Sequence, residues 1–204
     1  MHSILLLLGC FLLGSIPFSY LVVRLGTGSD LRDVGSGNPG ATNAMRAAGP
    51  ALALLGLVLD IAKGFAPVWL GRDAGLPDGL LAGTVLACVF GHTFSPFLAF
   101  RGGKGVATGL GALSALNPIA AAMSVAVFAF ATLAWRMVSL GSILGFAALP
   151  ILWLLPERLG HPPAAGGFGW LAAILVCGLV VVRHSGNLRR LRAGKEARLG
   201  ERTA

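Results

Sequence analysis

Apolar residues fill seven runs along this chain, and most of the polar residues gather in the short segments between them. A hydrocarbon layer about 30 Å thick takes roughly 20 apolar residues per helix, so this length has room for six or seven spans. We predict an all-α polytopic membrane protein, one domain over residues 1–204, with transmembrane helices at Ser3–Val23, Ala51–Leu70, Gly79–Ala99, Gly105–Leu116, Pro118–Trp135, Ser139–Leu155 and Gly169–Val182.

The run Gly105–Leu116 decides whether the count is seven, because it is short for a full crossing. It must tilt, thin the bilayer or re-enter, and without it every later orientation is reversed. The composition supports the membrane class, since 55% of the residues are hydrophobic and 12% are charged.

The distribution of Lys and Arg favours seven spans with the amino terminus outside. In that arrangement 13 of the 16 basic residues fall on one side, Arg72 and Arg158 fall on the other, and Lys63 lies within a span. Such a bias marks the cytoplasmic face, so we predict a bacterial cell-membrane protein with a basic cytoplasmic tail over residues 188–204. Attraction to membrane lipids accounts for the net charge of +8 without a nucleic acid.

A polar, glycine-rich patch, Gly35–Arg46, follows the first span. Asn38 and Pro39 have the character of a helix N-cap and first turn, and Gly49-Pro50 is typical of a stop, which predicts a short interfacial helix. A phosphate would meet free N–H groups and the positive end of the helix dipole at its start. A tight turn with an arginine anchored to lipid headgroups explains the same residues equally well.

Three loops carry polar residues to the predicted cytoplasmic face, and together they would form a cationic site for a multiply charged substrate. They are the Gly35–Arg46 patch, the segment 91–104 and the segment 183–187. In the second loop Lys104 follows two glycines and would contact phosphate, although a lipid anchor beside a glycine turn is the alternative. Arg101 is a further candidate for the lining.

Two nucleotide-binding patterns are accidental matches. Gly35-x-Gly37-x-x-Gly40 satisfies the dinucleotide pattern but follows a membrane span instead of a strand. The segment 102–105 resembles the end of a phosphate-binding loop, but position 98 is leucine and no Ser or Thr follows Lys104. Both nucleotide-site interpretations are therefore rejected.

Charged and polar residues within the apolar runs have structural explanations. Asp60 and Lys63 lie three residues apart on one spanning helix, where an ion pair offsets the cost of charge in the membrane. His92 is interpreted as a hydrogen-bonded structural histidine. The three cysteines lie in apolar segments without ligand partners, so we expect no disulfide, no metal and no cofactor.

Five motifs follow one another along the chain: Gly35-Ser36-Gly37-Asn38-x-Gly40-Ala41-Thr42-Asn43-x-x-Arg46, Asp60-x-x-Lys63-Gly64-x-x-Pro67, Gly91-His92-x-x-x-Pro96, Phe100-x-Gly102-Gly103-Lys104-Gly105-Val106-Ala107-Thr108 and His184-x-x-Asn187. Together and in this order they resemble the signature of the acyl-phosphate:glycerol-3-phosphate acyltransferases of the PlsY type. They depart from that pattern at proline 39 and arginine 101.

The resemblance implies transfer of a fatty acyl group from acyl phosphate to the 1-hydroxyl of glycerol 3-phosphate, which yields lysophosphatidic acid and phosphate and begins phospholipid synthesis. Acyl phosphate is already an activated mixed anhydride, so direct attack by the hydroxyl needs no serine nucleophile. No protein partner is evident. The resemblance assigns catalytic roles to Ser36, Arg46, Lys104, His184 and Asn187.

His184 would hydrogen-bond the glycerol or accept its proton, and a substrate phosphate is the other candidate acceptor. The expected substrate-binding residues are Gly37, Asn38, Gly40, Thr42, Asn43, Gly64, Gly102, Gly103, Ser139 and Ser142, with packing as the alternative role for the two serines.

Two other classes fit less well. A transporter of phosphorylated or anionic metabolites would show inverted repeats and a binding site near the membrane midplane, and the sequence has no such repeats. The His-x4-Asp acyltransferase motif is absent, because the residues five positions after the four histidines are Leu7, Phe97, Gly166 and Arg189.

Overall fold

The computed structural model describes residues 2–200, and every element within that range is a helix. Most of these helices are long and apolar, as the uninterrupted apolar runs predict. The elements are α1 (His2–Ser15), α2 (Phe18–Thr27), α3 (Ala41–Asp73), α4 (Asp78–Thr93), the 3₁₀ turn η1 (Pro96–Leu98), α5 (Val106–Leu116), α6 (Pro118–Trp135), α7 (Val138–Leu152), α8 (Leu154–Arg158), α9 (Gly166–Arg183) and α10 (Ser185–Arg192).

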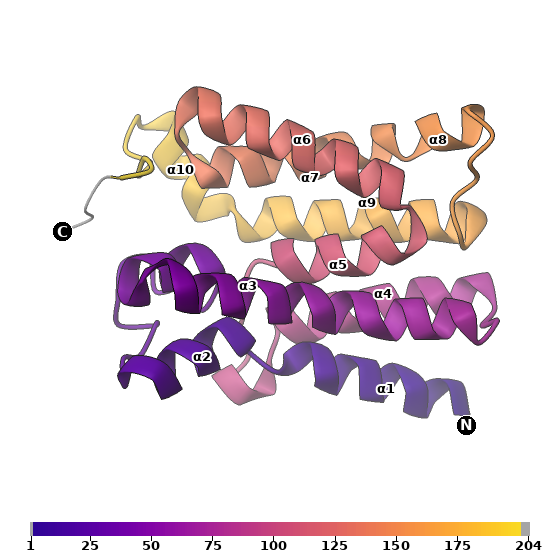
Figure 1. Ribbon diagram of the computed structural model, residues 1–204, viewed down its shortest axis with the longest axis horizontal. Coiled ribbons are helices and arrows are strands. Elements are labelled where there is room, and N and C mark those ends of the chain that lie inside the picture. The colour runs from indigo at the N-terminus through magenta and orange to yellow at the C-terminus, as the bar shows by residue number, and fades with distance from the viewer. Residues whose placement is uncertain (1, 201–204) are drawn as a thin grey trace.

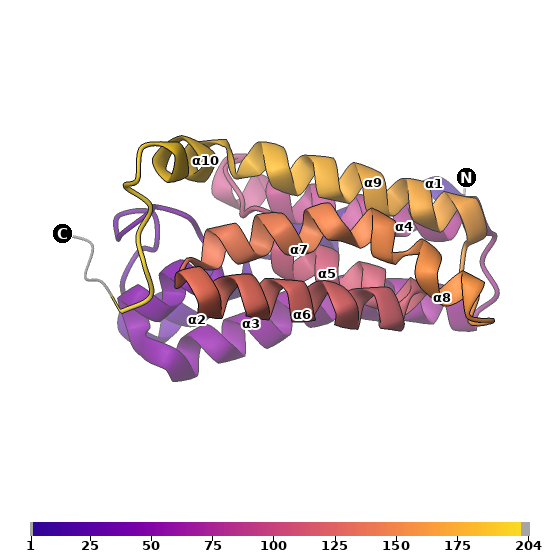
Figure 2. The ribbon, with the colours of Figure 1, turned by 90° about the horizontal axis from the view of Figure 1, so that it is seen from above.

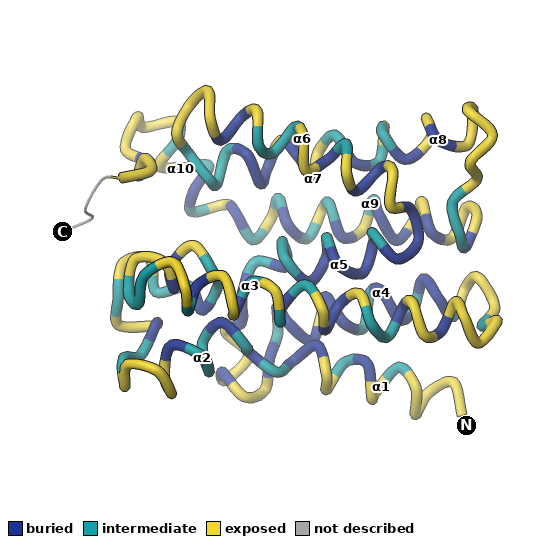
Figure 3. Tube along the Cα trace, viewed as in Figure 1, coloured by how far each residue is buried: buried dark blue, intermediate teal, exposed yellow. Residues whose placement is uncertain are grey.

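The helices form an elongated bundle in which α1–α4 lie on one side, α6–α9 lie on the other, and α5 runs between them (Figure 1). The start of α1 and the helix α10 lie at opposite ends of the long axis in both views (Figures 1 and 2). Buried positions follow the inward faces and much of α5, while exposed positions lie outward (Figure 3). Many of the exposed side chains are large and apolar, as expected for surfaces that face lipid.

Six helical stretches within residues 2–200 are long and apolar enough to span a membrane. Val106–Leu116 is apolar but has only 11 residues. The prediction of a polytopic all-α membrane protein is therefore confirmed, whereas the count of seven spans stays a prediction. The six stretches are His2–Thr27, Ala41–Asp73, Asp78–Leu98, Pro118–Trp135, Val138–Arg158 and Gly166–Arg183.

Helix α5 packs against α3 with backbone touching backbone. A β-carbon at Gly64 would collide with the carbonyl of Thr108, and one at Gly111 would collide with the carbonyl of Ile61. Small residues permit this approach, which is the usual basis of tight helix pairs in membranes. Gly64, predicted to contact substrate, therefore lies at a helix crossing.

The first span is not the continuous helix predicted over Ser3–Val23. Helix α1 ends at Ser15 and α2 begins at Phe18, with Pro17 between them. Proline has no N–H to donate and its ring clashes with the preceding turn, so a helix cannot continue through this position undisturbed. The break leaves backbone groups without helical partners inside the bundle.

The buried pair Asp60 and Lys63 supplies those partners. Lys63 Nζ donates to the carbonyl of Ile16 at 2.6 Å, and Asp60 Oδ2 accepts from the N–H and the hydroxyl of Ser19 at 3.3 and 2.6 Å. The expected ion pair is present, with Lys63 Nζ 2.7 Å from Asp60 Oδ1. Nδ1 of the buried His92 lies 3.0 Å from Lys63 Nζ, within hydrogen-bonding distance.

Helix α3 starts two residues later than the sequence suggested. The N-cap is Gly40 and not Asn38: Gly40 is extended (φ −104°, ψ 171°), and its carbonyl accepts from the N–H groups of Asn43 and Ala44. Gly49 (φ 79°, ψ 180°) breaks the helix, so residues 41–48 form a separate short segment as expected from Gly49-Pro50.

We expect Asp60→Ala to destabilise the protein by about 3–5 kcal/mol, because it leaves the Lys63 ammonium buried without its counter-charge. The measurement is thermal unfolding of purified protein in detergent. The double variant Asp60→Leu/Lys63→Met should recover part of the loss, since it removes both charges at similar volume. An unfolding temperature of Asp60→Ala equal to that of the wild type would contradict a stabilising role for the ion pair.

Candidate active site

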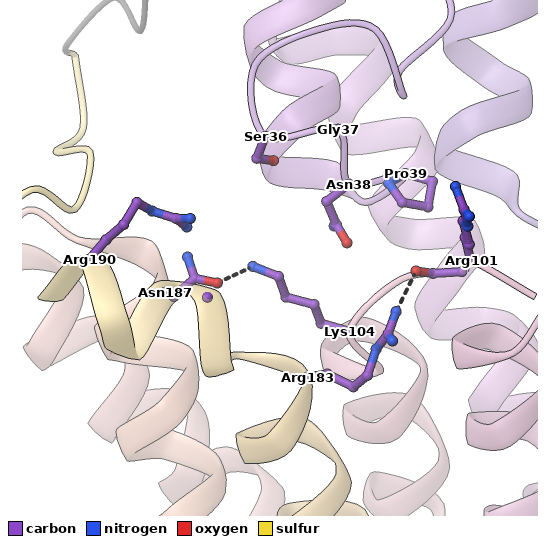
Figure 4. Close-up of a pocket in the computed structure, with 11 residues that line it drawn as sticks. Ser36, Gly37, Asn38, Pro39, Arg101, Lys104, Arg183, Asn187 and Arg190 are labelled. Carbon is purple, nitrogen blue, oxygen red and sulfur yellow. Dashed lines mark hydrogen bonds between the residues drawn. The ribbon is translucent and has the colours of Figure 1, made fainter.

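A cavity of about 290 Å³ opens at the end of the bundle where three chain segments meet (Figure 4). One wall comes from the loop before α3, a second from the loop before α5, and a third from the junction of α9 and α10. The lining residues are Ser36, Gly37, Asn38, Pro39, Arg101, Gly102, Lys104, Arg183, Gly186, Asn187 and Arg190. The convergence of three loops that the sequence predicted is therefore present.

The first wall is shaped by a residue that lies behind it. Asn43 is almost fully buried, and its side-chain oxygen accepts from the N–H of Ser36 at 3.2 Å. Its amide nitrogen donates to the carbonyls of Leu31 and Val34 at 2.8 and 2.9 Å. Because this amide is occupied by the backbone, Asn43 holds the loop in shape instead of lining the cavity.

The second wall lies on the end of α4. The N–H of Gly102 donates to Thr93 O and that of Gly103 to His92 O, both at 3.1 Å. A β-carbon at either glycine would collide with His92, and Gly105 has a positive φ of 84°. The glycines therefore let the loop lie flat against α4 and turn sharply into α5, with Lys104 projecting into the cavity.

The third wall contains two arginines that the sequence reasoning did not select. Arg183 and Arg190 lie four residues before and three after Asn187, the spacing that places helical residues on one face. Arg183 donates to Gly102 O at 3.1 Å and lies over the ring of Phe94 at 5.8 Å. Their spacing around Asn187 was the available signal, but the general excess of basic residues in this part of the chain concealed it.

Lys104 is the cation on which the three walls converge. Its Nζ donates to Asn187 Oδ1 at 2.6 Å (Figure 4). The pKa of Lys104 is lowered to about 8, chiefly by burial; the negative charge of Glu196 opposes this shift, and the positive charges of nearby arginines contribute to it. A site rich in cations with one incompletely stabilised ammonium is suited to bind phosphate.

His184 lies behind the cavity and not in its lining. It is 2% exposed, and its Nδ1 is 2.7 Å from Val180 O. A carbonyl only accepts, so Nδ1 carries the hydrogen and Nε2 is left as an acceptor. Burial, followed by the charge of Lys104, lowers the pKa of His184 to about 4, so the imidazole is neutral at physiological pH.

The structure brings only some of the predicted residues to the cavity. Ser36, Gly37, Asn38, Gly102, Lys104 and Asn187 line it. Arg46 is exposed and is not among the lining residues. Its Cδ lies 3.6 Å from where a β-carbon on Gly35 would be, so its side chain lies against the first loop.

The remaining candidates lie outside the lining. Thr42 is exposed on the first turn of α3. Ser142 is buried and donates to Val138 O at 2.9 Å within its own helix, and Ser139 donates to Glu196 Oε1 at 2.7 Å. These contacts give the two serines structural partners, the alternative that the sequence left open. Three predicted glycines also lie outside the lining. Gly40 caps α3, Gly64 lies where α3 crosses α5, and Gly103 lies against His92.

The bundle and the cavity define a polytopic membrane protein with a polar cavity, lined by several cationic side chains, at one end. Residues 4–194 match the profile of the glycerol-3-phosphate acyltransferase family. The chain is 41% identical over 194 residues to the glycerol-3-phosphate acyltransferase of Geotalea daltonii, covering 95% of this chain and 96% of that protein. It is 44% identical over 196 residues to that of Thermus thermophilus, covering 96% and 94%.

Solved structures agree. The crystal structure of PlsY (YgiH), an integral membrane glycerol 3-phosphate acyltransferase, in its glycerol 3-phosphate form has a TM-score of 0.88 at 38% identity, covering 98% of this chain and 96% of that chain. The lysophosphatidic acid form has a TM-score of 0.85 at 35% identity over the same shares. The chain therefore belongs to the glycerol-3-phosphate acyltransferase family of integral membrane enzymes.

Affinity for inorganic phosphate should fall about tenfold between pH 7 and pH 9, because Lys104, with its pKa of about 8, loses its charge over that range. Isothermal titration of phosphate into the purified protein at each pH measures this affinity. Sulfate, whose charge is constant over this range, controls for titration of the ligand. Lys104→Arg should remove the decline, since guanidinium stays charged; a decline that persists in this variant would assign it to another group.

Proposed function

We propose that this acyltransferase takes its acyl group from acyl phosphate and transfers it to the 1-hydroxyl of glycerol 3-phosphate at the cytoplasmic face of a bacterial cell membrane. The observation that carries the proposal is the cavity in which Lys104, Arg183 and Arg190 face the Ser36 loop. Both substrates carry a phosphate, and several cations around one cavity match two anions held side by side. No cofactor enters the reaction.

The reaction balances with the two substrates alone. The hydroxyl oxygen attacks the acyl carbonyl carbon and forms the ester bond, while the bond from that carbon to the phosphate oxygen breaks. The phosphate leaves with the electron pair. Lys104 and Arg46 are suited to stabilise the negative charge that develops on the carbonyl oxygen and on the departing phosphate. Holding both substrates in attack geometry supplies much of the acceleration.

The environment of His184 supports a hydrogen-bonding role over a proton-accepting one. Its lowered pKa of about 4 makes the imidazole a weak base, and protonation would place a second charge beside Lys104. Nε2 is left as an acceptor, so the glycerol hydroxyl would donate the hydrogen bond; because the ring lies behind the cavity lining, this contact requires the glycerol to reach past that lining. The hydroxyl proton then passes to a phosphate oxygen, which is available in both substrates.

The path of the chain supports seven passes. Since the start of α1 and α10 lie at opposite ends of the bundle (Figure 1), an odd number of crossings connects them. If α1 with α2 and α7 with α8 count as single passes, α5 brings the number to seven. Its 11 residues begin two positions after Lys104, which lines the cavity. The basic residues then lie on the cytoplasmic side with the cavity. A transporter is less favoured, because its site would lie near the midplane.

The purified protein in detergent should release phosphate when given acyl phosphate and glycerol 3-phosphate together, and acyl-CoA and acyl carrier protein test the choice of donor. In sealed vesicles, externally added glycerol 3-phosphate should react only where the cytoplasmic face is outward. Turnover in right-side-out vesicles alone would overturn the orientation. Uptake of substrate without product would overturn the enzymatic proposal.

His184→Ala should lower kcat by no more than about tenfold, whereas loss of a general base typically costs 10²–10⁴-fold. The measurement is kcat against pH in detergent. His161→Ala is the matched control, because His161 is exposed in the loop between α8 and α9, and that loop lies at the end of the bundle opposite α10. A loss above a hundredfold, accompanied by a changed acidic limb of the profile, would make His184 the base.

A further inference from the structure

Glu196 is a buried carboxylate beside the cavity for which the proposed reaction has no role. It is 9% exposed, although it lies in the basic tail after α10. Its Oε1 accepts from the hydroxyl of Ser139 at 2.7 Å and from the amide of Asn187 at 2.6 Å, and its Oε2 accepts from Nε of Arg190 at 2.8 Å. Three partners from α7 and α10 therefore hold one carboxylate.

The chain beyond α10 is folded back by two further contacts. The N–H of Lys195 donates to Arg190 O at 2.8 Å, which closes a turn at the end of α10. The N–H of Leu199 donates to Arg136 O at 2.6 Å, and the Arg136 guanidinium donates to Leu199 O at 2.8 Å. This part of the predicted basic tail is thus a strap across the end of α6 and α7. Residues 201–204, with Arg202, lie outside the described residues.

We propose that Glu196 is a positioning residue that orients the Asn187 amide toward Lys104 and keeps the Lys104 ammonium charged for phosphate binding. The proposal rests on the proposed function of the cavity. Glu196 does not line the cavity and acts through Asn187 and through its negative charge.

The hydrogen bonds determine which way the Asn187 amide faces. A carboxylate only accepts and an ammonium only donates, so the amide NH₂ must face Glu196 and the amide oxygen must face Lys104. The opposite orientation would place two acceptors together and two donors together. Without Glu196, the amide NH₂ loses its acceptor and only the Lys104 ammonium still favours this orientation, so the contact to Lys104 is held from one side instead of two.

The charge of Glu196 offsets an excess of positive charge around Lys104. Arg46, Arg183 and Arg190 all lower the pKa of Lys104, whereas Glu196 raises it. The neighbouring His184 is neutral and adds no charge.

Glu196 itself is ionised. Burial alone would raise its pKa, but the hydrogen bonds from Ser139, Asn187 and Arg190 outweigh burial and lower it. A negative charge is therefore present beside the cavity over the working pH range.

The experiment measures the Lys104 pKa directly and does not depend on turnover. The rate of reductive methylation at Lys104 is followed against pH by mass spectrometry of the Lys104 peptide in wild type, Glu196→Gln and Glu196→Asp. Glu157→Gln is the matched control, because Glu157 is an exposed carboxylate on α8 at the opposite end of the bundle. Steady-state kinetics with both substrates is recorded on the same preparations.

We expect the Lys104 midpoint to fall about one pH unit in Glu196→Gln, as for loss of one charge a few ångströms away, and to stay at the wild-type value in Glu157→Gln. KM for the phosphorylated substrates should rise above pH 7 more than at pH 6. Glu196→Asp, which keeps the charge at a shorter reach, should give a smaller fall, and it carries the test if Glu196→Gln does not fold.

An unchanged Lys104 midpoint together with a lower unfolding temperature would assign Glu196 to stability alone and overturn the proposal. A shifted midpoint in a protein that releases no phosphate from its substrates would support the role of Glu196 and reject the proposed reaction. The two hypotheses are therefore separable.

Discussion

The break between α1 and α2 is the constraint on which the bundle depends. In hydrocarbon an unpaired backbone group costs several kcal/mol, so a broken membrane helix needs side-chain partners at both new ends. Lys63 donates to Ile16 O at the end of α1, and Asp60 accepts from the N–H of Ser19 at the start of α2. A cation at a carboxyl end and an anion at an amino end also match the helix dipoles. One ion pair therefore stabilises both ends while each charge offsets the other.

The same pair positions the site. Lys63 contacts His92, whose carbonyl accepts from the loop that carries Lys104. Beyond that loop, the hydroxyl of Thr108 donates to Asp60 O at 3.1 Å and holds the start of α5. Lys104 lies between these two attachments. A buried network at the broken helix thus determines where the ammonium projects, although none of these partners reaches the substrate cavity.

The features that could be predicted from the sequence are those set by residues close together in the chain. Apolar runs predicted the helices, Gly49-Pro50 predicted the break in α3, and the spacing of two opposite charges predicted their pairing. Features set by contacts between distant segments were missed. Gly64 serves a helix crossing that is visible only once α5 is placed beside α3. In the sequence, Arg183 and Glu196 resemble the other charges near the end of the chain, and only the fold shows that they turn inward. Pro17 was a local signal, but the apolar run around it concealed the break.

The low pKa of Lys104 links protonation to substrate binding. A phosphate beside the ammonium would stabilise its charged form, so under the proposed function the first phosphorylated substrate would raise the pKa of Lys104 above about 8. By thermodynamic reciprocity, the protonated site binds that phosphate more tightly. The site therefore reaches full positive charge when anions occupy it, which limits charge repulsion among Lys104 and its neighbouring arginines when it is empty. In the proposed reaction, the substrates would thus complete the positive charge that stabilises the departing phosphate.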